Sequence, residues 1–392
     1  MFLLDNDLYK FTTSYAYMKL FPDAECTFTF NDRNHTPRTK DFLKCFEILI
    51  SNLSCAIITK SQIAWCIENI PYIPNWYWEW LESFRFDPEK IRFRLDHNNE
   101  LSINVTDKAY KCTLYEVPLL YCVTEAQSLV DGKTITADDI NSRLMPKIKL
   151  ANENGIKFSE FGTRRRYNYN VQNTVINTIK NHAKTCTGTS NVYFAYDYGM
   201  KPMGTHPHEW FMFHGAQYGY KQANYIALEN WVKVYDGDLG IALSDTFTTE
   251  VFLNNFSMKH AKLFDGVRQD SGSEYRFVDK VIERYKEFDI NPLTKTIIFS
   301  NALDFPKALE IQKYCAGKIN CSFGIGTNLT NDIGATPENI VMKMSRCRIN
   351  RKKDWNNCVK ISDDLGKEQG NPDEINLAYM QLKLFDTICQ QD

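Results

Sequence analysis

Residues 296–304 read TIIFSNALD, in which a short apolar run is followed at once by hydroxyl, amide and carboxylate side chains. Such a run, ended by polar residues, is typical of a buried strand that carries the polar groups at its carboxyl end. Five further stretches have this form and precede a helical stretch: 158–166, 193–209, 239–246, 264–272 and 320–328. They recur about every 25–40 residues, the spacing of βα units. The sequence therefore predicts an α/β fold with a parallel sheet or barrel and a site at its strand ends.

The N-terminal third follows a different pattern. Residues 8–18 place apolar side chains on one helical face and end before Pro22. Residues 26–30 alternate between apolar and polar side chains, and residues 91–105 alternate again around an Asn-Asn pair. These patterns predict a helix, a strand and a hairpin, in that order.

The sequence DGK at 131–133 interrupts the apolar pattern and marks a domain boundary. We predict an α+β N-terminal domain over residues 1–130, with residues 350–392 as a candidate for completing it. Residues 131–349 are expected to form the barrel domain.

The composition narrows the functional classes. Lys and Arg number 46 against 48 Asp and Glu, and the net charge of -2 argues against a dedicated nucleic-acid binder. The 12 cysteines include no C-x-x-C pair, which is typical of reduced thiols. The chain opens with neither a signal peptide nor an apolar run long enough to span a membrane, so we expect a cytoplasmic protein without membrane or nucleic-acid partners.

Three of the seven histidines lie within nine residues, in and just after GTHPHEW at 204–210. His206 and His208 form an H-x-H pair, which metal-dependent barrel hydrolases use together with further ligands downstream. A second interpretation is a reactive imidazole that is held by Glu209 and accepts a phosphoryl group. A third is a Gly-Pro turn whose imidazoles only bond to the backbone. The residues alone leave all three open.

Two predicted strand ends carry charged groups. FGTRRR at 161–166 combines an aromatic ring with three guanidinium groups, which suits a planar anion as well as it suits a solvated start of a helix. RQDSG at 268–272 adds a cation and a carboxylate. Asp270 is a candidate partner of sugar hydroxyls or Mg²⁺, or alternatively a helix cap.

Two later strand ends carry polar groups and glycines. SNALD at 300–304 offers hydroxyl, amide and carboxylate groups, and GIGTN at 324–328 would expose backbone N–H groups. A late glycine-rich loop is a common phosphate site in barrels. Together the strand ends predict a pocket for a phosphorylated sugar, a planar anion and a reactive histidine.

These stretches resemble the nicotinate phosphoribosyltransferases, which belong with the nicotinamide and quinolinate phosphoribosyltransferases. The resemblance covers nearly the whole chain and is specific, because several independent motifs occur in the same order. The motifs are DNDLYKFT at 5–12, YEVPL at 115–119, FSEFGTRRR at 158–166, GTHPHEW at 204–210, SDT at 244–246, VRQDSG at 267–272 and FGIGTNLTND at 323–332.

The resemblance implies an α+β N-terminal domain joined to an irregular TIM-like α/β barrel, in a homodimer with shared active sites. It implies a ligase-type enzyme of NAD biosynthesis that joins nicotinate to phosphoribosyl pyrophosphate, giving nicotinate mononucleotide and pyrophosphate. ATP would be a co-substrate, converted to ADP and phosphate through a phosphohistidine, and Mg²⁺ would act with the substrates.

By position, the resemblance implies that His208 is the phosphohistidine and that Glu209 and Asp270 are catalytic. Phe161 would stack on the pyridine ring, opposite the partner subunit's Tyr9, and Asp270 would meet the ribose or Mg²⁺. The remaining expected substrate-binding residues are Arg164, Arg165, Thr205, Ser244, Asp245, Arg268, Ser271, Asn301, Asp304, Gly324, Gly326 and Thr327.

Other functions remain open at this point. A sister enzyme acting on nicotinamide or quinolinate would share the fold, although Arg164, Arg165, Arg166 and Arg268 favour a carboxylate. A non-catalytic sensor would bind nicotinate or phosphoribosyl pyrophosphate without turnover. A metal-dependent barrel hydrolase would use the H-x-H pair as ligands.

Overall fold

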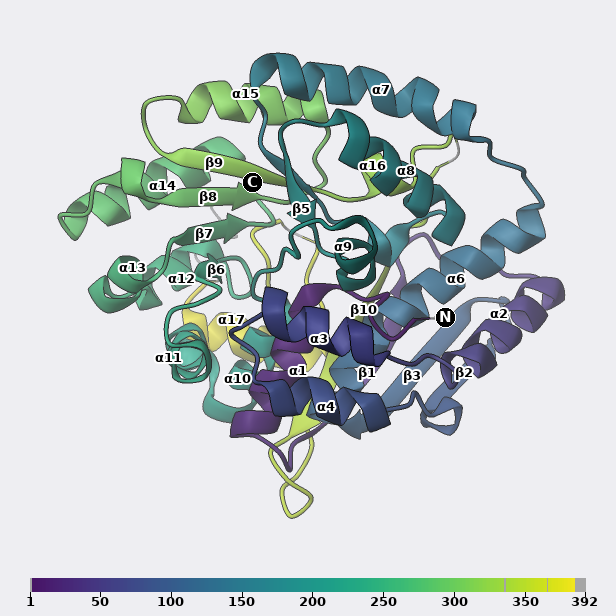
Figure 1. The fold of residues 1–392 in the computed structure, drawn as a ribbon. Helices are drawn as coiled ribbons and strands as arrows, with labels where there is room; N and C mark the ends of the chain where they lie inside the picture. The colour runs from purple at the N-terminus through teal and green to yellow at the C-terminus, as the bar shows by residue number, and fades with distance from the viewer. Residues whose placement is uncertain (1, 335, 365, 385–392) are drawn as a thin grey trace.

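The computed structural model describes residues 2–334, 336–364 and 366–384, which form two sheets surrounded by helices (Figure 1). The antiparallel sheet has the strand order β11-β10-β1-β3-β2, and the parallel sheet has the order β5-β4-β9-β8-β7-β6. The predicted fold class, an α/β barrel-like domain joined to an α+β N-terminal domain, is confirmed. The strands are β1 (Glu25–Asp32), β2 (Ile91–Leu95), β3 (Leu101–Lys108), β4 (Phe158–Glu160), β5 (Cys186–Thr189), β6 (Ile241–Leu243), β7 (Gly266–Gln269), β8 (Thr296–Phe299), β9 (Asn320–Ile325), β10 (Ile340–Arg348) and β11 (Asn356–Asn357).

The N-terminal elements follow the sequence pattern. The helix expected over residues 8–18 is α1 (Leu8–Leu20), which buries Phe11 and Tyr15 and ends before Pro22. The expected hairpin is formed by β2 and β3, and Asn99 in its turn has a positive φ of 61°. The other helices of this part are α2 (Lys40–Leu53), α3 (Lys60–Asn69), α4 (Asn75–Ser83), α5 (Ala109–Cys112) and α6 (Glu116–Asp131), with the short turns η1 (Pro88–Lys90) and η2 (Thr113–Tyr115).

Strand β10 brings the chain back to the N-terminal sheet after the parallel sheet is complete. It pairs with β1 from Ile340, opposite Asp32, to Arg348, opposite Glu25. The range 131–349 that was predicted for the barrel therefore includes a strand of the other sheet. Because β1 lies between β10 and β3, it is an inner strand and is buried along most of its length. Beyond β10, the chain adds β11 and α17 (Pro372–Leu382).

Each parallel strand is followed by helical structure, as the βα spacing predicts. Figure 1 shows α14 and α15 outside strands β7, β8 and β9. The strands expected in five of the six stretches are present as β4, β6, β7, β8 and β9. The helices and turns of this part are α7 (Ala137–Asn154), η3 (Thr163–Arg165), α8 (Tyr169–His182), α9 (Val192–Tyr198), α10 (His208–Tyr218), η4 (Tyr220–Gln222), α11 (Ala223–Tyr235), α12 (Thr249–Asn255), α13 (Met258–Leu263), α14 (Glu274–Glu287), η5 (Pro292–Thr294), α15 (Phe305–Cys315) and α16 (Thr327–Thr330).

The sixth prediction, a strand within residues 193–209, is wrong. This apolar and aromatic run forms α9, and the strand of that unit is β5, just before it. The Asn191 side chain accepts a hydrogen bond from the N–H of Phe194 and so caps the helix, and Gly199 ends it with a φ of 59°. These local end signals decide the structure of a run whose composition also suits a strand.

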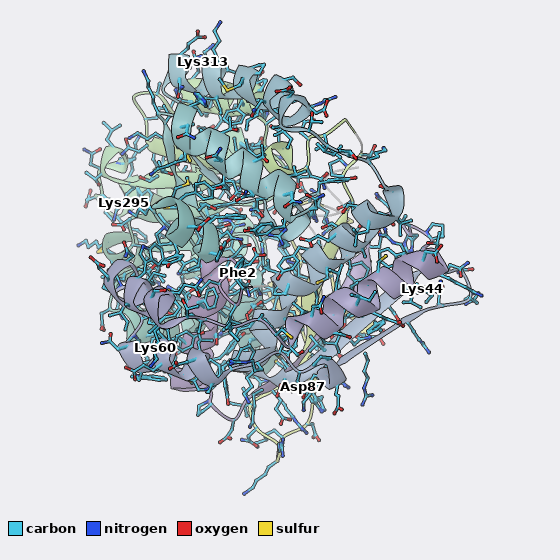
Figure 2. All side chains as sticks on the ribbon, turned by 45° about the vertical axis from the view of Figure 1, so that its right-hand side comes forward. Phe2, Lys44, Lys60, Asp87, Lys295 and Lys313 are labelled. Carbon is cyan, nitrogen blue, oxygen red and sulfur yellow. The ribbon has the colours of Figure 1, made fainter. Side chains whose placement is uncertain are left out.

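The N-terminal segment joins the two sheets. The N–H of Leu8 donates to the carbonyl of Ser190 at 2.7 Å, and the N–H of Tyr193 donates to the carbonyl of Leu4 at 2.8 Å. Phe2, near the centre of Figure 2, stacks on Tyr193 with 3.9 Å between ring centroids. The start of α1 is thereby fixed against the end of β5. None of the described helices is both long and apolar enough to cross a membrane.

Candidate active site

A cavity of ≈ 660 Å³ opens at the carboxyl ends of β4, β7, β8 and β9, beside α1 and β10. Ser244 and Asp245, which were expected in the site, are fully buried and are not part of its wall. Ser244 donates to the carbonyl of Arg268 at 2.8 Å and so supports the end of β7. The other predicted residues line the cavity: Tyr9, Phe161, Arg164, Arg165, Thr205, His208, Glu209, Arg268, Asp270, Ser271, Asn301, Asp304, Gly324, Gly326 and Thr327.

His208 is the first residue of α10, and a buried carboxylate fixes its imidazole. Its Nε2 lies 2.9 Å from Oδ1 of Asp245. Asp245 also accepts hydrogen bonds from Ser271 Oγ at 2.7 Å and from Lys360 Nζ at 3.0 Å. Burial alone would raise the pKa of Asp245, but Lys360 and His208 beside it hold that pKa well below its usual value. Burial and the nearby Lys360 lower the pKa of His208 to about 4. The imidazole is therefore neutral at neutral pH, with its Nε2–H donated to an ionised Asp245.

Glu209 does not hold His208, contrary to the sequence-based expectation. Its carboxylate contacts the Nζ of Lys10 and accepts a hydrogen bond from the hydroxyl of Thr113. Consecutive residues of a helix point about 100° apart, so Glu209 is directed away from the imidazole before it. Asp245, from the end of β6, takes the role that was expected of Glu209.

Asp270 and Arg268 form the wall opposite this imidazole. Asp270 Oδ2 lies 3.7 Å from Nε2 of His208, and Asp270 Oδ1 accepts a hydrogen bond from Ser300 Oγ at 2.7 Å. Arg268 donates to Ser300 Oγ and to Thr205 Oγ1, each at 2.7 Å, and pairs with Asp270 at 3.2 Å. Its guanidinium thus joins the ends of three chain segments at one point of the cavity.

An aromatic and cationic region lies at the end of β4. Phe161 packs so closely on Gly324 that a Cβ there would lie 2.4 Å from the ring, which explains the glycine. Among the described residues, Arg164 forms one ion pair, in which its Nη1 lies 3.6 Å from Oε1 of Glu116. Tyr9 belongs to this cavity in its own chain. That the partner subunit's Tyr9 completes this region across a dimer interface stays a prediction.

The buried carboxyl group of Glu160 stabilises the loop that follows β4. Glu160 accepts a hydrogen bond from the N–H of Gly162 at 2.5 Å and from Thr189 Oγ1 at 2.6 Å. Burial raises the pKa of Glu160 to about 7. These bonds fix the backbone from which Phe161 and Arg164 project.

Only two of the three consecutive arginines face the cavity. Arg165 lines it and donates from Nε to the carbonyl of Ile340 at 2.7 Å. Arg166 is buried, binds both oxygens of Asp5 at 2.8 and 2.9 Å, and bonds to Glu125 at 2.7 Å. Its guanidinium is used in the fold, so the expected contribution of Arg166 to anion binding is wrong.

His206 lies apart from His208 in an aromatic core. Its ring centroid is 4.5 Å from that of Trp231, and burial lowers its pKa to about 3. Neither ring nitrogen makes a hydrogen bond of ordinary geometry, although the backbone of Leu239 lies nearby. Among the described residues, the one group with the spacing of metal ligands is His208, Asp245 and Asp270, without His206. The hydrolase interpretation, which needs both histidines of the H-x-H pair, is therefore excluded by the geometry.

Sequence reasoning missed two lysines of the cavity wall. Lys343 projects from β10 and has no hydrogen-bond or ion-pair partner among the described side chains. Burial, together with Arg164 and Lys360, lowers its pKa to about 7. A signal was present, because both lysines interrupt apolar runs, MKM at 342–344 and VKI at 359–361. A lysine that interrupts a buried apolar run needs a specific reason.

Lys360 begins a loop that covers one side of the cavity. The backbones of Lys360 and Gln369 exchange two N–H···O bonds of 2.9 Å, which close this 360–369 loop. On its other side, Asp363 accepts hydrogen bonds from the N–H and hydroxyl of Thr249 at 2.8 and 2.6 Å. The side chains of the loop that line the cavity are those of Lys360, Ser362, Lys367 and Gln369.

Comparison with known proteins agrees with this geometry. Residues 156–386 match the model of the nicotinate phosphoribosyltransferase (NAPRTase) family, and residues 4–124 match the model of its N-terminal domain. A nicotinate phosphoribosyltransferase of Desulforapulum autotrophicum is 40% identical over 375 residues, which cover 95% of this chain and 96% of that protein. One of Chromohalobacter salexigens is 41% identical over 384 residues, covering 97% and 98%.

Solved structures give the same result. The crystal structure of nicotinate phosphoribosyltransferase from Porphyromonas gingivalis has a TM-score of 0.96 and 45% identity, covering 97% of this chain and 99% of that one. The enzyme from Vibrio cholerae has a TM-score of 0.92 and 32% identity, covering 100% and 96%. The chain therefore belongs to the nicotinate phosphoribosyltransferase family of enzymes.

Proposed function

We propose that this chain joins nicotinate to phosphoribosyl pyrophosphate, forming nicotinate mononucleotide for NAD biosynthesis, and that ATP drives the step by phosphorylating His208. One observation carries the proposal: a single cavity holds an aromatic and cationic region, a glycine-rich strand end and a neutral histidine fixed by an aspartate. No one of these features is specific, but a pyridine carboxylate, a phosphorylated sugar and a phosphoryl donor need all three.

The region at the end of β4 suits the base. Phe161 and Tyr9 offer aromatic faces, and Arg164 and Arg165 offer guanidinium groups beside them. Charge-assisted hydrogen bonds are roughly twice as strong as neutral ones. Nicotinate is therefore preferred over nicotinamide, whose amide carries no charge for these cations.

The late strand ends suit the phosphorylated ribose. A Cβ on Gly326 would lie 2.8 Å from the carbonyl oxygen of Phe161, so only glycine allows the backbone to pass there. The N–H groups of Thr327 and Asn328 begin α16 and have no carbonyl partner within that helix. They provide donors for the 5'-phosphate, and Asn301 and Asp304 face the same space with groups that suit ribose hydroxyls.

Lys343 and Lys360 suit the pyrophosphate that leaves. Both line the cavity wall, and Lys343 forms no ion pair with any of the described residues. A phosphate group beside Lys343 would raise its lowered pKa and keep it charged. These two residues stabilise negative charge as the bond between ribose and pyrophosphate breaks.

Mg²⁺ fits one carboxylate of the site. The oxygens of Asp245 are occupied by His208, Ser271 and Lys360, whereas Asp270 Oδ2 makes no hydrogen bond among the described residues. Mg²⁺ is commonly held by one or two carboxylates together with substrate phosphates and water. Asp270 would hold the ion, which supplies positive charge to the pyrophosphate when bound.

His208 is prepared to accept a phosphoryl group. Because Nε2 donates its proton to Asp245, the lone pair of the neutral ring resides on Nδ1. In the phosphorylation step, this nitrogen forms a bond to the γ-phosphorus of ATP and the bond to ADP breaks. Asp245 stabilises the charge that develops on the ring. Hydrolysis of the phosphohistidine later returns the free imidazole and inorganic phosphate.

The proposal is tested by measuring nicotinate mononucleotide formation from nicotinate and phosphoribosyl pyrophosphate, with and without ATP. We expect product in both cases, a higher rate with ATP, and much lower turnover of nicotinamide. Saturable binding of nicotinate without any product would favour a sensor. Equal turnover of the two bases would contradict the role of Arg164 and Arg165.

A further inference from the structure

Lys10 is a buried cation that the proposed chemistry does not use. It follows Tyr9 on α1, and its side chain has no exposed surface. Its Nζ contacts a carboxylate oxygen of Glu116 and one of Glu209 and lies 3.4 Å from Thr113 Oγ1. Two carboxylates thus share one cation away from water. In such a buried place, a carboxylate that loses its cation destabilises the fold strongly.

This cluster contacts the site at both ends. At one end, Glu116 Oε1 lies 3.6 Å from Arg164, in the region proposed for nicotinate. At the other end, Glu209 directly follows His208 in the first turn of α10. The contacts run without a gap from Arg164 through Glu116 and Lys10 to Glu209.

The two carboxylates compete unequally for Lys10. Burial raises the pKa of Glu209 even though Lys10 lies beside it. Burial would also raise the pKa of Glu116, but Lys10, Lys343 and Arg164 together lower it. The charge of the Glu116 carboxylate is therefore stabilised more than that of Glu209, as long as Arg164 lies beside Glu116.

We propose that Lys10 is a positioning residue that couples occupation of the nicotinate region to phosphorylation of His208. The inference rests on the proposed function and adds a route between its two sites. A carboxylate bound by Arg164 competes with Glu116 for that guanidinium, and Glu116 then relies more strongly on Lys10. The altered contact between Lys10 and Glu209 moves the first turn of α10, which carries the imidazole.

The test compares ATP hydrolysis with and without nicotinate in the full-length enzyme. We define the stimulation as the ratio of the two rates. Lys10→Met should reduce this ratio to within about twofold of one, because the link between Glu116 and Glu209 is lost. Lys10→Arg should retain part of the stimulation. The matched control is Lys19→Met, on the same helix, whose Nζ donates to two backbone carbonyls of α11 and forms no ion pair with the described residues.

A second variant keeps the test decisive if Lys10→Met does not fold. Glu116→Gln preserves the shape of the side chain but removes the charge that responds to Arg164. It should lose the stimulation, while the KM for nicotinate should stay the same or fall, because Arg164 is then free of its competitor. A general structural defect would instead lower both rates and leave their ratio unchanged.

The outcomes separate the coupling from the function on which it rests. If the wild-type enzyme neither hydrolyses ATP nor forms a phosphohistidine, the proposed ATP step fails, and the coupling fails with it. If the wild type is stimulated by nicotinate and folded Lys10→Met and Glu116→Gln are stimulated equally, only the coupling is overturned.

Discussion

His206 and His208 are two residues apart, yet their surroundings give them opposite roles. His208 lies 2.9 Å from the carboxylate of Asp245, whereas His206 packs 4.5 Å from the ring of Trp231. The sequence could identify the pair, and the family resemblance could choose His208. It could not identify Asp245 as the partner of the imidazole, because that contact joins residues 37 positions apart. The sequence predicts the adjacent Glu209 as this partner, but helix geometry directs the Glu209 side chain away from the imidazole.

The role of Asp245 predicts the behaviour of Asp245→Asn. The amide keeps the shape of the side chain but neither holds the imidazole in one tautomer nor stabilises positive charge on it. We expect phosphorylation of His208 to slow by about 100-fold, the low end of typical acid–base contributions. The measurement is the rate of label transfer from γ-labelled ATP, with Ser244→Ala as the neighbouring control. A rate within threefold of wild type would show that Asp245 is not needed.

The protonation of His208 is a second prediction at this scale. Burial and Lys360 lower its pKa to about 4, so the ring should remain neutral as the pH falls from 7 to 5 and gain a proton only near pH 4. NMR titration of the imidazole measures this directly. In Lys360→Met, the loss of a nearby cation stabilises the imidazolium, so the midpoint should move to higher pH. An unchanged or lower midpoint would rule out this effect of Lys360.

At the scale of elements, the βα repeat allowed most strands to be predicted, because an apolar run followed by polar residues is a local signal. Helix α9 was missed because its run suits a strand equally well, and its capping residue Asn191 lies just before the run. The contribution of β10 was missed for another reason. Its pairing with β1 joins segments more than 300 residues apart in the chain, and no local pattern encodes such a contact.

Strand β10 places Lys343 in the cavity, and this predicts a specific kinetic defect. A hydrogen bond between charged groups contributes about 1.5–3 kcal/mol. Lys343→Met should therefore raise the KM for phosphoribosyl pyrophosphate by about tenfold or more, while the KM for nicotinate changes little. Lys313→Met, an exposed position on α15 at the periphery of Figure 2, is the control. A larger effect on nicotinate than on phosphoribosyl pyrophosphate would assign Lys343 to the wrong substrate.

At the scale of the molecule, the site exists because two sheets from different parts of the chain face one cavity. The parallel sheet supplies its strand ends, the antiparallel sheet supplies β10, and the N-terminal segment supplies α1. Arg166 ties these parts together, because it follows β4 and binds Asp5, which precedes α1, at 2.8 and 2.9 Å. The sequence showed a basic cluster here but not which of its arginines is used inside the fold.

Removing this tie should affect stability more than chemistry. Arg166→Met leaves the buried Asp5 and the partly buried Glu125 without their cation, which should lower the free energy of unfolding by about 3–5 kcal/mol. Denaturant unfolding measures the loss, with the exposed Arg276→Met as the control. A loss of less than 1 kcal/mol would mean that the two parts are held together by other contacts.

The central claim is that His208 takes a phosphoryl group from ATP, and labelling with γ-labelled ATP tests it most directly. The account predicts an acid-labile, alkali-stable label on the peptide that contains both His206 and His208. His208→Ala should abolish the label and the ATP stimulation while slow transfer continues, and His206→Ala should keep the label. A label that persists in His208→Ala, or that disappears only in His206→Ala, would contradict the account.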